Sequence, residues 1–246
     1  NIMKLEVKNL EKKFKNFTAV KNINFHIDNG QTLGVLGPNG CGKTTTIGML
    51  LGLIKPSNGK ILIDDENFEN LNREKILSQF NFASPYVELP KKLTVKENLE
   101  IYGRLYGVKD LTRRIQEVSG DLNLSLFLNK KTGELSSGQK NRVSLAKSLI
   151  NNPKILFLDE PTASLDPDIG DFVREYIERY KKNNELTILL ASHNMKEVER
   201  LCNKVIMMKQ GKIVDSGTCG ELIKKHGREN LEDTFLKIAR SKNELE

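Results

Sequence analysis

Residues 37–44 read Gly37-Pro38-Asn39-Gly40-Cys41-Gly42-Lys43-Thr44 and fit the phosphate-loop pattern G-x-x-x-x-G-K-[ST] at every fixed position. The glycines of such a loop let successive backbone N–H groups point at a polyphosphate. A short apolar run at 32–36 precedes the loop, and a helix-like stretch from Thr44 to Leu53 follows it. The sequence therefore predicts a nucleotide-binding loop between a strand and a helix.

Two side chains of this loop have predicted chemical roles. Lys43 supplies a cation for the β- and γ-phosphates, and Thr44 can place its hydroxyl on Mg²⁺. The helix that follows adds the positive end of its dipole. The predicted nucleotide-binding residues are Gly37, Pro38, Asn39, Gly40, Cys41, Gly42, Lys43, Thr44 and Thr45.

Composition is typical of a soluble globular protein. The chain has 246 residues, of which 38% are hydrophobic and 29% charged, and no apolar run approaches the length of a bilayer span. Its three cysteines are an odd number without metal-ligand spacing, which favours a reduced, cytosolic setting. The net charge of +7 would suit nucleic acid or an anionic membrane. Because it is spread over short Lys/Arg pairs, we expect a solvated basic surface and no nucleic-acid partner.

Strand-like and helix-like segments alternate along the chain, which predicts an α/β fold with a mostly parallel sheet. From Thr94 to about Leu149 the pattern is helical without a strand signal, so we expect a helical insertion in a nucleotide-binding core. Thr94 with Glu97, and Thr218 with Glu221, are capping boxes that open helices. The predicted strands are Leu5–Val7, Asn24–Ile27, Thr32–Leu36, Lys60–Ile63, Lys154–Leu158, Leu186–Leu190, Val205–Met208 and Lys212–Asp215, the last two joined as a hairpin through Gln210-Gly211.

Two adjacent carboxylates follow the apolar run that begins at Ile155. Asp159 and Glu160 then lie at the carboxyl end of a buried strand, the edge at which open α/β sheets bind ligands. Like charges so close together destabilise a turn unless a cation is near. We expect Asp159 to hold Mg²⁺ through water and Glu160 to polarise the water that attacks a γ-phosphate. An acidic turn after a core strand is the alternative interpretation.

His193 follows another strand-like run and precedes a helix that carries Met195, Val198 and Leu201. An imidazole at this position can hydrogen-bond a γ-phosphate or hold the attacking water. Taken alone, His193 would more simply be a polar surface or capping residue. The phosphate loop and the acidic pair favour the catalytic interpretation.

The segment Leu135-Ser136-Ser137-Gly138-Gln139 opens a helix that we expect to run from Lys140 to Ile150. Small residues at a helix start expose backbone N–H groups and two hydroxyls, which makes a second anion site. Ordinary N-capping by serine is the alternative. Since one chain cannot easily use two anion sites on one nucleotide, the pattern favours two copies that face head to tail and complete each other's sites.

These motifs, in this order and over nearly the whole sequence, resemble the ATP-binding subunit of an ATP-binding cassette (ABC) transporter. Gly37–Thr44 is similar to the Walker A loop, Leu135–Gln139 to the signature motif and Ile155–Glu160 to Walker B. His193 resembles the switch histidine, and Phe14 matches the aromatic residue that stacks on adenine, with an ordinary core or surface phenylalanine as its alternative. The D-loop is matched by Ser164, Leu165 and Asp166.

The resemblance implies a P-loop NTPase (RecA-like) core with an antiparallel β subdomain and an inserted α-helical subdomain at about 90–152, all within one ATP-binding domain spanning 3–246. It also implies ATP and Mg²⁺ as ligands, and a second ABC ATPase subunit, identical or a close paralogue, whose signature motif reaches the γ-phosphate. An integral membrane permease would be a separate polypeptide, which places this chain at the cytoplasmic face of the membrane. The short length and a terminal helix at Leu231–Ala239 resemble the ATPase subunits of ABC-2-type exporters.

Two positions depart from the family pattern. Ser137 replaces the first glycine of the signature and keeps a small hydrogen-bond donor. The glutamine expected in the Q-loop falls on Pro85, beside Ser84, while Gln79 lies too early, inside the preceding strand by our assignment. Either water or the Ser84 hydroxyl takes its place on Mg²⁺, or coupling through this loop differs. The resemblance implies that the segment Asn81–Leu93, with Tyr86, Leu89 and Pro90, contacts a cytoplasmic helix of the membrane partner, because the family docks its partner there.

Two further functions are compatible with a cassette ATPase. One is a soluble enzyme that acts on nucleic acid, the ribosome or an assembly scaffold, in keeping with the basic charge. The interval between the phosphate loop and the acidic pair, however, lacks the sustained heptads of a coiled-coil insertion. The other is a regulatory cassette that binds ATP but scarcely hydrolyses it, against which Asp159, Glu160 and His193 argue. We therefore expect a transport ATPase.

Overall fold

The structure is a computed structural model that describes residues 3–163 and 165–240. The chain divides into two compact units, Met3–Leu71 together with the segment from Thr187 onward, and Asn72–Leu186. The helical insertion predicted at 90–152 lies within the second of these units. Its status as a separate subdomain, and the assignment of 3–246 to one domain, stay predictions.

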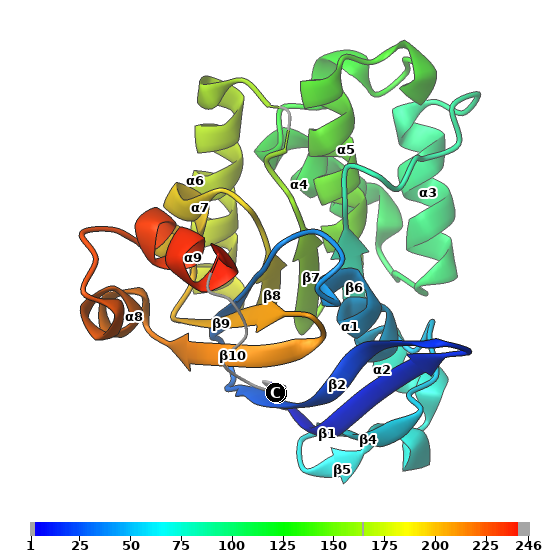
Figure 1. Cartoon of the computed structure of the whole chain (residues 1–246). Helices are drawn as coiled ribbons and strands as arrows, with labels where there is room; N and C mark the ends of the chain where they lie inside the picture. Colours follow the sequence, from blue (N-terminus) through cyan, green and yellow to red (C-terminus); the bar gives the residue numbers. More distant parts are fainter. Residues whose placement is uncertain (1–2, 164, 241–246) are drawn as a thin grey trace. The chain divides into compact units, whose positions relative to one another are not determined.

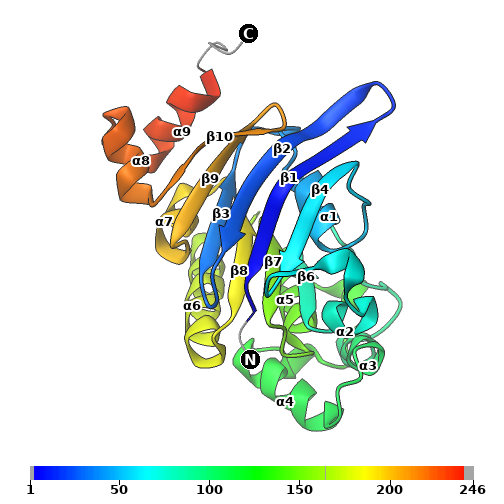
Figure 2. The ribbon, with the colours of Figure 1, turned by 90° about the horizontal axis from the view of Figure 1, so that it is seen from below.

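An antiparallel sheet forms the first part of unit 1, with the strand order β2-β1-β4-β5, and its first three strands lie side by side in Figure 2. Alternate residues of β1 are buried up to Val7, as expected for a sheet with one covered face. Asn9 and Asn22 then adopt positive φ where the pairing register shifts. Because these bulges break the two-residue period, the sequence pattern shows only the ends of two long strands. The strands are β1 (Leu5–Phe14), β2 (Phe17–Ile27), β4 (Asn58–Ile63) and β5 (Glu66–Asn67), and a 3₁₀ turn, η1 (Phe68–Asn70), follows.

The other strands of unit 1 lie in the order β10-β9-β3-β8. β3 pairs in parallel with both β8 and β9, which confirms the predicted parallel arrangement, and β10 is antiparallel to β9. Every residue of β3 and of β8 is buried, as continuous apolar runs predict for strands covered on both faces. The strands are β3 (Thr32–Leu36), β8 (Thr187–Ala191), β9 (Lys204–Lys209) and β10 (Lys212–Gly217).

The helices of unit 1 follow its strands. Helix α1 (Lys43–Leu50) ends earlier than the predicted Leu53, because Gly52 takes a positive φ of 68° and its N–H bonds the carbonyl of Met49. The predicted capping box of Thr218 and Glu221 opens α8. Figure 1 shows α8 and α9 together beside β9 and β10. The remaining helices are α7 (Met195–Leu201), α8 (Cys219–His226) and α9 (Leu231–Arg240).

Unit 2 has a parallel strand pair and a group of helices. β6 and β7 pair from Phe80↔Ile155 to Ala83↔Leu158, and the predicted capping box of Thr94 and Glu97 opens α3. Figure 1 shows α3, α4 and α5 grouped together. The strands are β6 (Phe80–Ala83) and β7 (Ile155–Asp159); the α-helices are α2 (Arg73–Leu77), α3 (Val95–Leu105), α4 (Leu111–Asp121), α5 (Ser137–Leu149) and α6 (Pro167–Asn184); the 3₁₀ turns are η2 (Ser125–Phe127) and η3 (Thr132–Glu134).

No helix in the described ranges 3–163 and 165–240 combines the length and the apolar character that crossing a bilayer requires.

Candidate functional site

The phosphate loop of unit 1 connects β3 to α1. Its tight path depends on glycine, because Gly42 has a φ of 109° and forms the N-cap of α1. At Gly37 an added Cβ would lie 2.4 Å from both the Cys41 sulfur and the Met208 carbonyl oxygen, so no larger residue fits. The Cys41 N–H closes the turn on the Pro38 carbonyl at 3.2 Å. The loop thus brings backbone N–H groups to a helix start, the geometry that binds phosphate.

Lys43 turns its ammonium back into this loop. The side chain is buried, and Nζ donates to the carbonyl oxygens of Gly37 and, at 3.3 Å, of Pro38. The Cys41 sulfur lies 3.9 Å from the same Nζ, and burial raises the pKa of this thiol above its ordinary value. The neutral thiol of Cys41 therefore lies beside the Lys43 ammonium at the centre of the loop, where the sequence predicts the β- and γ-phosphates.

A support for this loop comes from the β9–β10 turn, whose sequence predicts a hairpin but not this contact. Gly211 donates its N–H to the Cys41 carbonyl at 3.0 Å and accepts from the Lys21 N–H at 2.7 Å. Gly211 has a φ of 83°, and an added Cβ would lie 2.7 Å from the Ala19 carbonyl oxygen. One glycine therefore joins the phosphate loop to β2 by backbone bonds alone. The sequence feature that could have pointed to this contact is Gly211 in the short hairpin, because glycine there allows a positive φ and a close approach of another backbone segment.

Phe14 and His193, the other predicted site residues of unit 1, are both exposed. Phe14 ends β1, pairs with Phe17 across a tight hairpin, and has the Lys12 ammonium 4.9 Å above its ring centre. With 44% of its surface exposed, the ring is available to stack on a flat ligand. His193 lies in the turn between β8 and α7. This turn is fixed by a buried 2.5 Å bond from the Ser192 hydroxyl to Glu197.

Unit 2 contains the acidic pair. Asp159 is the last residue of β7, and Glu160 follows it with a φ of 52°, in the left-handed region that a residue with a side chain adopts only under restraint. The Ala163 N–H bonds the Glu160 carbonyl at 3.0 Å, and the Asn141 amide donates to the Pro161 carbonyl at 2.6 Å. These two hydrogen bonds therefore hold the backbone of the turn that carries Glu160. No sequence motif predicted the contribution of Asn141.

The predicted D-loop follows this turn. Leu165 donates its N–H to the Thr162 carbonyl, and Asp166 occupies the N-cap position of α6, where its side chain makes no capping bond. A carboxylate at a helix start is favoured by the helix dipole. Ser164, the remaining member of this predicted motif, lies outside the described residues.

The signature-like segment forms the start of α5, which begins at Ser137 rather than at the predicted Lys140. The earlier start arises from a capping box: the Ser136 hydroxyl accepts from the Gln139 N–H at 3.3 Å, and the Gln139 side chain accepts from the Ser136 N–H at 3.0 Å. Leu135 is buried and anchors the segment. A hydroxyl that accepts one bond keeps its hydrogen for another acceptor, so capping and anion binding are compatible at Ser136. Ser137 and Gly138 form the first turn.

The segment after β6 lacks the expected glutamine side chain. Pro85 stands there, and the Ser84 hydroxyl accepts from the Tyr86 N–H at 3.3 Å. The prediction that Gln79 lies inside a strand was wrong: it occupies the turn before β6, where its amide donates to the carbonyl of Lys75 in α2. Neither Pro85 nor Gln79 therefore presents an amide oxygen after β6.

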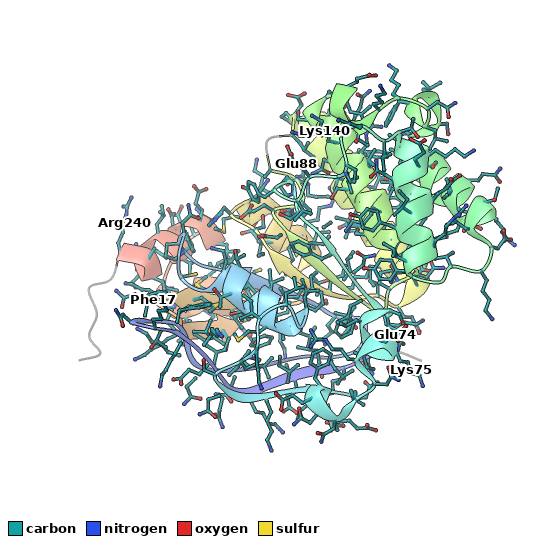
Figure 3. All side chains as sticks on the ribbon, turned by 90° about the vertical axis from the view of Figure 1, so that its right-hand side faces the viewer. Phe17, Glu74, Lys75, Glu88, Lys140 and Arg240 are labelled. Carbon is teal, nitrogen blue, oxygen red and sulfur yellow. The ribbon has the colours of Figure 1, made fainter. Side chains whose placement is uncertain are left out.

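A pocket of about 260 Å³ lies in unit 2 between this segment and α5. Tyr86 is 73% exposed at its rim. Glu88 and Lys140 lie near each other there in Figure 3, and both Lys91, through a 2.8 Å ion pair, and the charge of Lys140 lower the pKa of Glu88. The walls are formed by Ser84, Pro85, Tyr86, Val87, Glu88, Leu89, Lys91, Thr132, Leu135, Ser137, Lys140, Asn141, Val143, Ser144 and Ala163.

The donors predicted for Mg²⁺ are hard oxygen ligands. Thr44 is exposed in the first turn of α1, and Asp159 is half-buried at the end of β7. A hydroxyl and a carboxylate, completed by water and phosphate oxygens, are the ligand types that Mg²⁺ prefers. The residue chemistry therefore fits the ion.

The predicted site residues thus divide between the two units. The phosphate loop, Phe14 and His193 belong to unit 1. Asp159, Glu160, the signature-like segment and the described D-loop residues Leu165 and Asp166 belong to unit 2.

Comparison with known proteins gives consistent matches. The family described as ABC transporter matches residues 20–163. The ABC transporter ATP-binding protein NatA of Bacillus subtilis (strain 168) is 34% identical over 223 residues, which covers 89% of each chain. The Nod factor export ATP-binding protein I of Rhizobium sp. (strain N33) is 36% identical over 229 residues, 90% of this chain and 73% of the relative.

Among solved structures, a dimeric ATP-binding cassette in a post-hydrolysis state, bound to ADP and Pi, superposes with a TM-score of 0.79. It is 26% identical in sequence, and the match covers 87% of this chain and 98% of that one. The similarity extends to the mixed α/β architecture, which confirms the predicted P-loop NTPase fold.

Proposed function

Because this chain belongs to the ABC transporter family, in which it is an ATP-hydrolysing subunit, we propose that two such subunits bind two Mg-ATP molecules between them and drive a separate membrane permease. The observation that carries this proposal is the pair of anion-binding features within one chain. One is the phosphate loop that ends at Lys43, and the other is the capped start of α5 at Ser136–Gln139. When two copies pair, the nucleotide held by the phosphate loop of one copy becomes the ligand for the start of α5 in the other copy.

In this proposal the nucleotide is held by unit 1. The loop Gly37–Thr45 wraps the phosphates, and the Lys43 ammonium exchanges its carbonyl partners for β- and γ-phosphate oxygens. Phe14 stacks on the adenine ring with its exposed face. Thr44 and Asp159 hold Mg²⁺, which neutralises charge on the phosphates when it is bound.

Hydrolysis is assigned to Glu160 and His193. Glu160 orients and polarises the attacking water, and the imidazole of His193 bonds the γ-phosphate or that water. Leu165 and Asp166, with Ser164, form the D-loop contact with the second subunit. Closure of the two subunits excludes water, and loss of the γ-phosphate removes the charge that bridges them.

The pocket beside α5 is the proposed docking site for the permease. Its exposed Tyr86 and Val87 offer apolar contact. At its edge Glu88 pairs with Lys91, and Lys140 leaves an excess of one positive charge among these three residues. These features suit a short amphipathic cytoplasmic helix with acidic residues at its ends. The chain would then work at the cytoplasmic face of the membrane, and its similarity to a Nod factor export protein supports export.

The test combines a slow-hydrolysis variant with a blocked signature. Glu160→Gln should retain ATP binding, nearly abolish turnover, and form a dimer with Mg-ATP on a calibrated sizing column. Adding Ser137→Arg should leave ATP binding intact and keep the protein monomeric, because a long side chain at this exposed position would occupy the space into which the second subunit brings its bound nucleotide. An undisturbed dimer in the double variant would contradict the proposed arrangement, and wild-type hydrolysis by Glu160→Gln would remove Glu160 from its role.

A further inference from the structure

We propose that Asn141 is a positioning residue for ATP hydrolysis, and that its side-chain amide fixes the backbone from which Glu160 projects. The inference rests on the proposed role of Glu160. It adds a residue of α5 that acts on Glu160 indirectly, through the carbonyl of Pro161, the next residue along the chain.

The contact is short and shielded from solvent. Asn141 Nδ2 donates to the Pro161 carbonyl oxygen at 2.6 Å, and the residue is only 9% exposed. The two residues are far apart in sequence, one on α5 and the other directly after Glu160, and both belong to unit 2. Because water has little access, nothing replaces the amide donor when it is removed.

Glu160 needs such a restraint because of its backbone. Its φ of 52° is a conformation that residues with a side chain rarely adopt, and it persists only where neighbouring bonds hold it. The ring of Pro161 fixes the next φ, so the direction of the Pro161 carbonyl is the remaining soft angle. Asn141 holds that carbonyl, and the Ala163 N–H holds the carbonyl of Glu160 itself.

The position of Asn141 on α5 gives the contact a functional meaning. The same helix begins with the capped segment Ser136–Gln139, which we propose meets the γ-phosphate bound by the second subunit. Asn141 also lines the pocket proposed to receive the permease. A helix moves as a rigid body, so a shift of α5 caused at either place reaches the Pro161 carbonyl through Asn141. Through this contact, the orientation of Glu160 depends on the position of α5.

The experiment compares Asn141→Leu, which removes the donor at similar size, with Asn141→Gln, which retains an amide. Asn141→Leu should lower kcat about tenfold to a hundredfold with KM for ATP unchanged within about twofold, since only the reacting geometry is disturbed. Asn141→Gln should recover much of this loss. Asn141→Ala is the second deletion, to be used if the leucine variant does not fold.

A double-variant cycle separates positioning from a structural role. In a Glu160→Gln background, Asn141→Leu should change the residual hydrolysis rate by less than about twofold, because the group that it orients is already gone. Asn98→Leu is the matched control. Asn98 is also buried in unit 2, and its amide donates to the carbonyls of Pro90 at 3.3 Å, Leu93 at 3.5 Å and Thr94 at 3.0 Å, all of which lie outside the segment that follows Glu160. It should leave kcat unchanged at a temperature where the protein is folded.

Three results would overturn the inference: wild-type kcat in Asn141→Leu, a loss seen mainly in KM, or an equal loss of rate in the Glu160→Gln background. A different result would contradict the proposed function: wild-type turnover in the single Glu160→Gln variant, whatever the kcat of the Asn141 variants.

Discussion

At the scale of single residues, the buried lysines Lys43 and Lys147 differ in the groups that surround their side-chain nitrogens. The Lys43 Nζ donates to carbonyl oxygens of its own loop. Lys147 on α5 is only 8% exposed; its Nζ donates to the Phe82 carbonyl at 2.8 Å and lies 5.4 Å from the centre of the Tyr102 ring. It has carbonyl and aromatic neighbours but no carboxylate contact in the described residues. Burial therefore lowers the pKa of Lys147 to about 8.

Lys147 should make stability depend on alkaline pH. Its pKa is about 8 in the folded protein and near 10.5 when unfolded, so the unfolded chain binds more protons between these values. The free energy of unfolding should accordingly rise with pH in this window. Relative to Lys147→Met, the wild type should gain about 2 kcal/mol between pH 7.5 and pH 10 in urea titrations. A difference between the two proteins that stays constant with pH would contradict this.

At the scale of elements, the β9–β10 hairpin and the helices after it support the phosphate loop. The hairpin turn bonds the phosphate loop and β2 through Gly211. The strand after it is tied to α8 by Asp215, whose carboxylate accepts from Lys225 at 2.7 Å and contacts His226 at 2.6 Å. Helices α8 and α9 then pack on an apolar cluster that includes Leu36, the residue before the loop. The phosphate loop is thus braced by elements distant in sequence.

Gly211→Ala should weaken ATP binding. The new Cβ would meet the Ala19 carbonyl oxygen at 2.7 Å in a backbone of positive φ, so the turn must shift and its bond to Cys41 lengthens. We expect a loss of about 1–3 kcal/mol in stability and reduced affinity for ATP by calorimetry. Gly107→Ala is the control, because Gly107 has a φ of 67° with open space around its Cβ. Equal ATP affinity in the two variants would argue against a role for the turn.

Asp215→Asn should loosen the C-terminal helices. Burial by itself raises the pKa of Asp215, but bonds from Lys225, His226 and the Ser216 N–H outweigh it and hold the pKa below its ordinary value. A lowered carboxyl pKa contributes stability at neutral pH that is lost as pH falls through the folded pKa. The variant should be less stable by about 1–3 kcal/mol at pH 7, with faster hydrogen exchange in α8, and the deficit should shrink in acid. Unchanged exchange in α8 would contradict the assigned contact.

At the scale of the whole molecule, local patterns predicted what is built from neighbouring residues. The phosphate loop, the buried strands, the two capping boxes and the helical character after Thr94 follow from local sequence patterns, and the fold class is confirmed. What the sequence could not predict depends on residues far apart: the bond from Asn141 to Pro161, the brace at Gly211 and the Asp215 cluster. The error at Gln79 and the late start assigned to α5 have a local cause, since turns and caps carry little periodicity.

Nucleotide should stabilise the chain through the Lys43 loop. A ligand that binds only the folded state adds RT ln(1 + [L]/Kd), about 2.7 kcal/mol at a hundredfold excess over Kd. Mg-ATP should therefore raise the melting temperature of the wild type by several degrees, and Lys43→Ala should lose this shift together with its heat of binding. An undiminished shift in Lys43→Ala would remove the loop from its role.

The contacts of the Lys43 ammonium within its own loop also bear on how ADP is released. The carbonyls of Gly37 and Pro38 accept hydrogen bonds from this ammonium within the loop. Under the proposed function, phosphate oxygens replace these carbonyls as partners of the ammonium, and the carbonyls can accept the ammonium again as ADP leaves. Nucleotide exchange would then replace one set of oxygen acceptors around Lys43 with another, so that the ammonium has an oxygen partner at each stage.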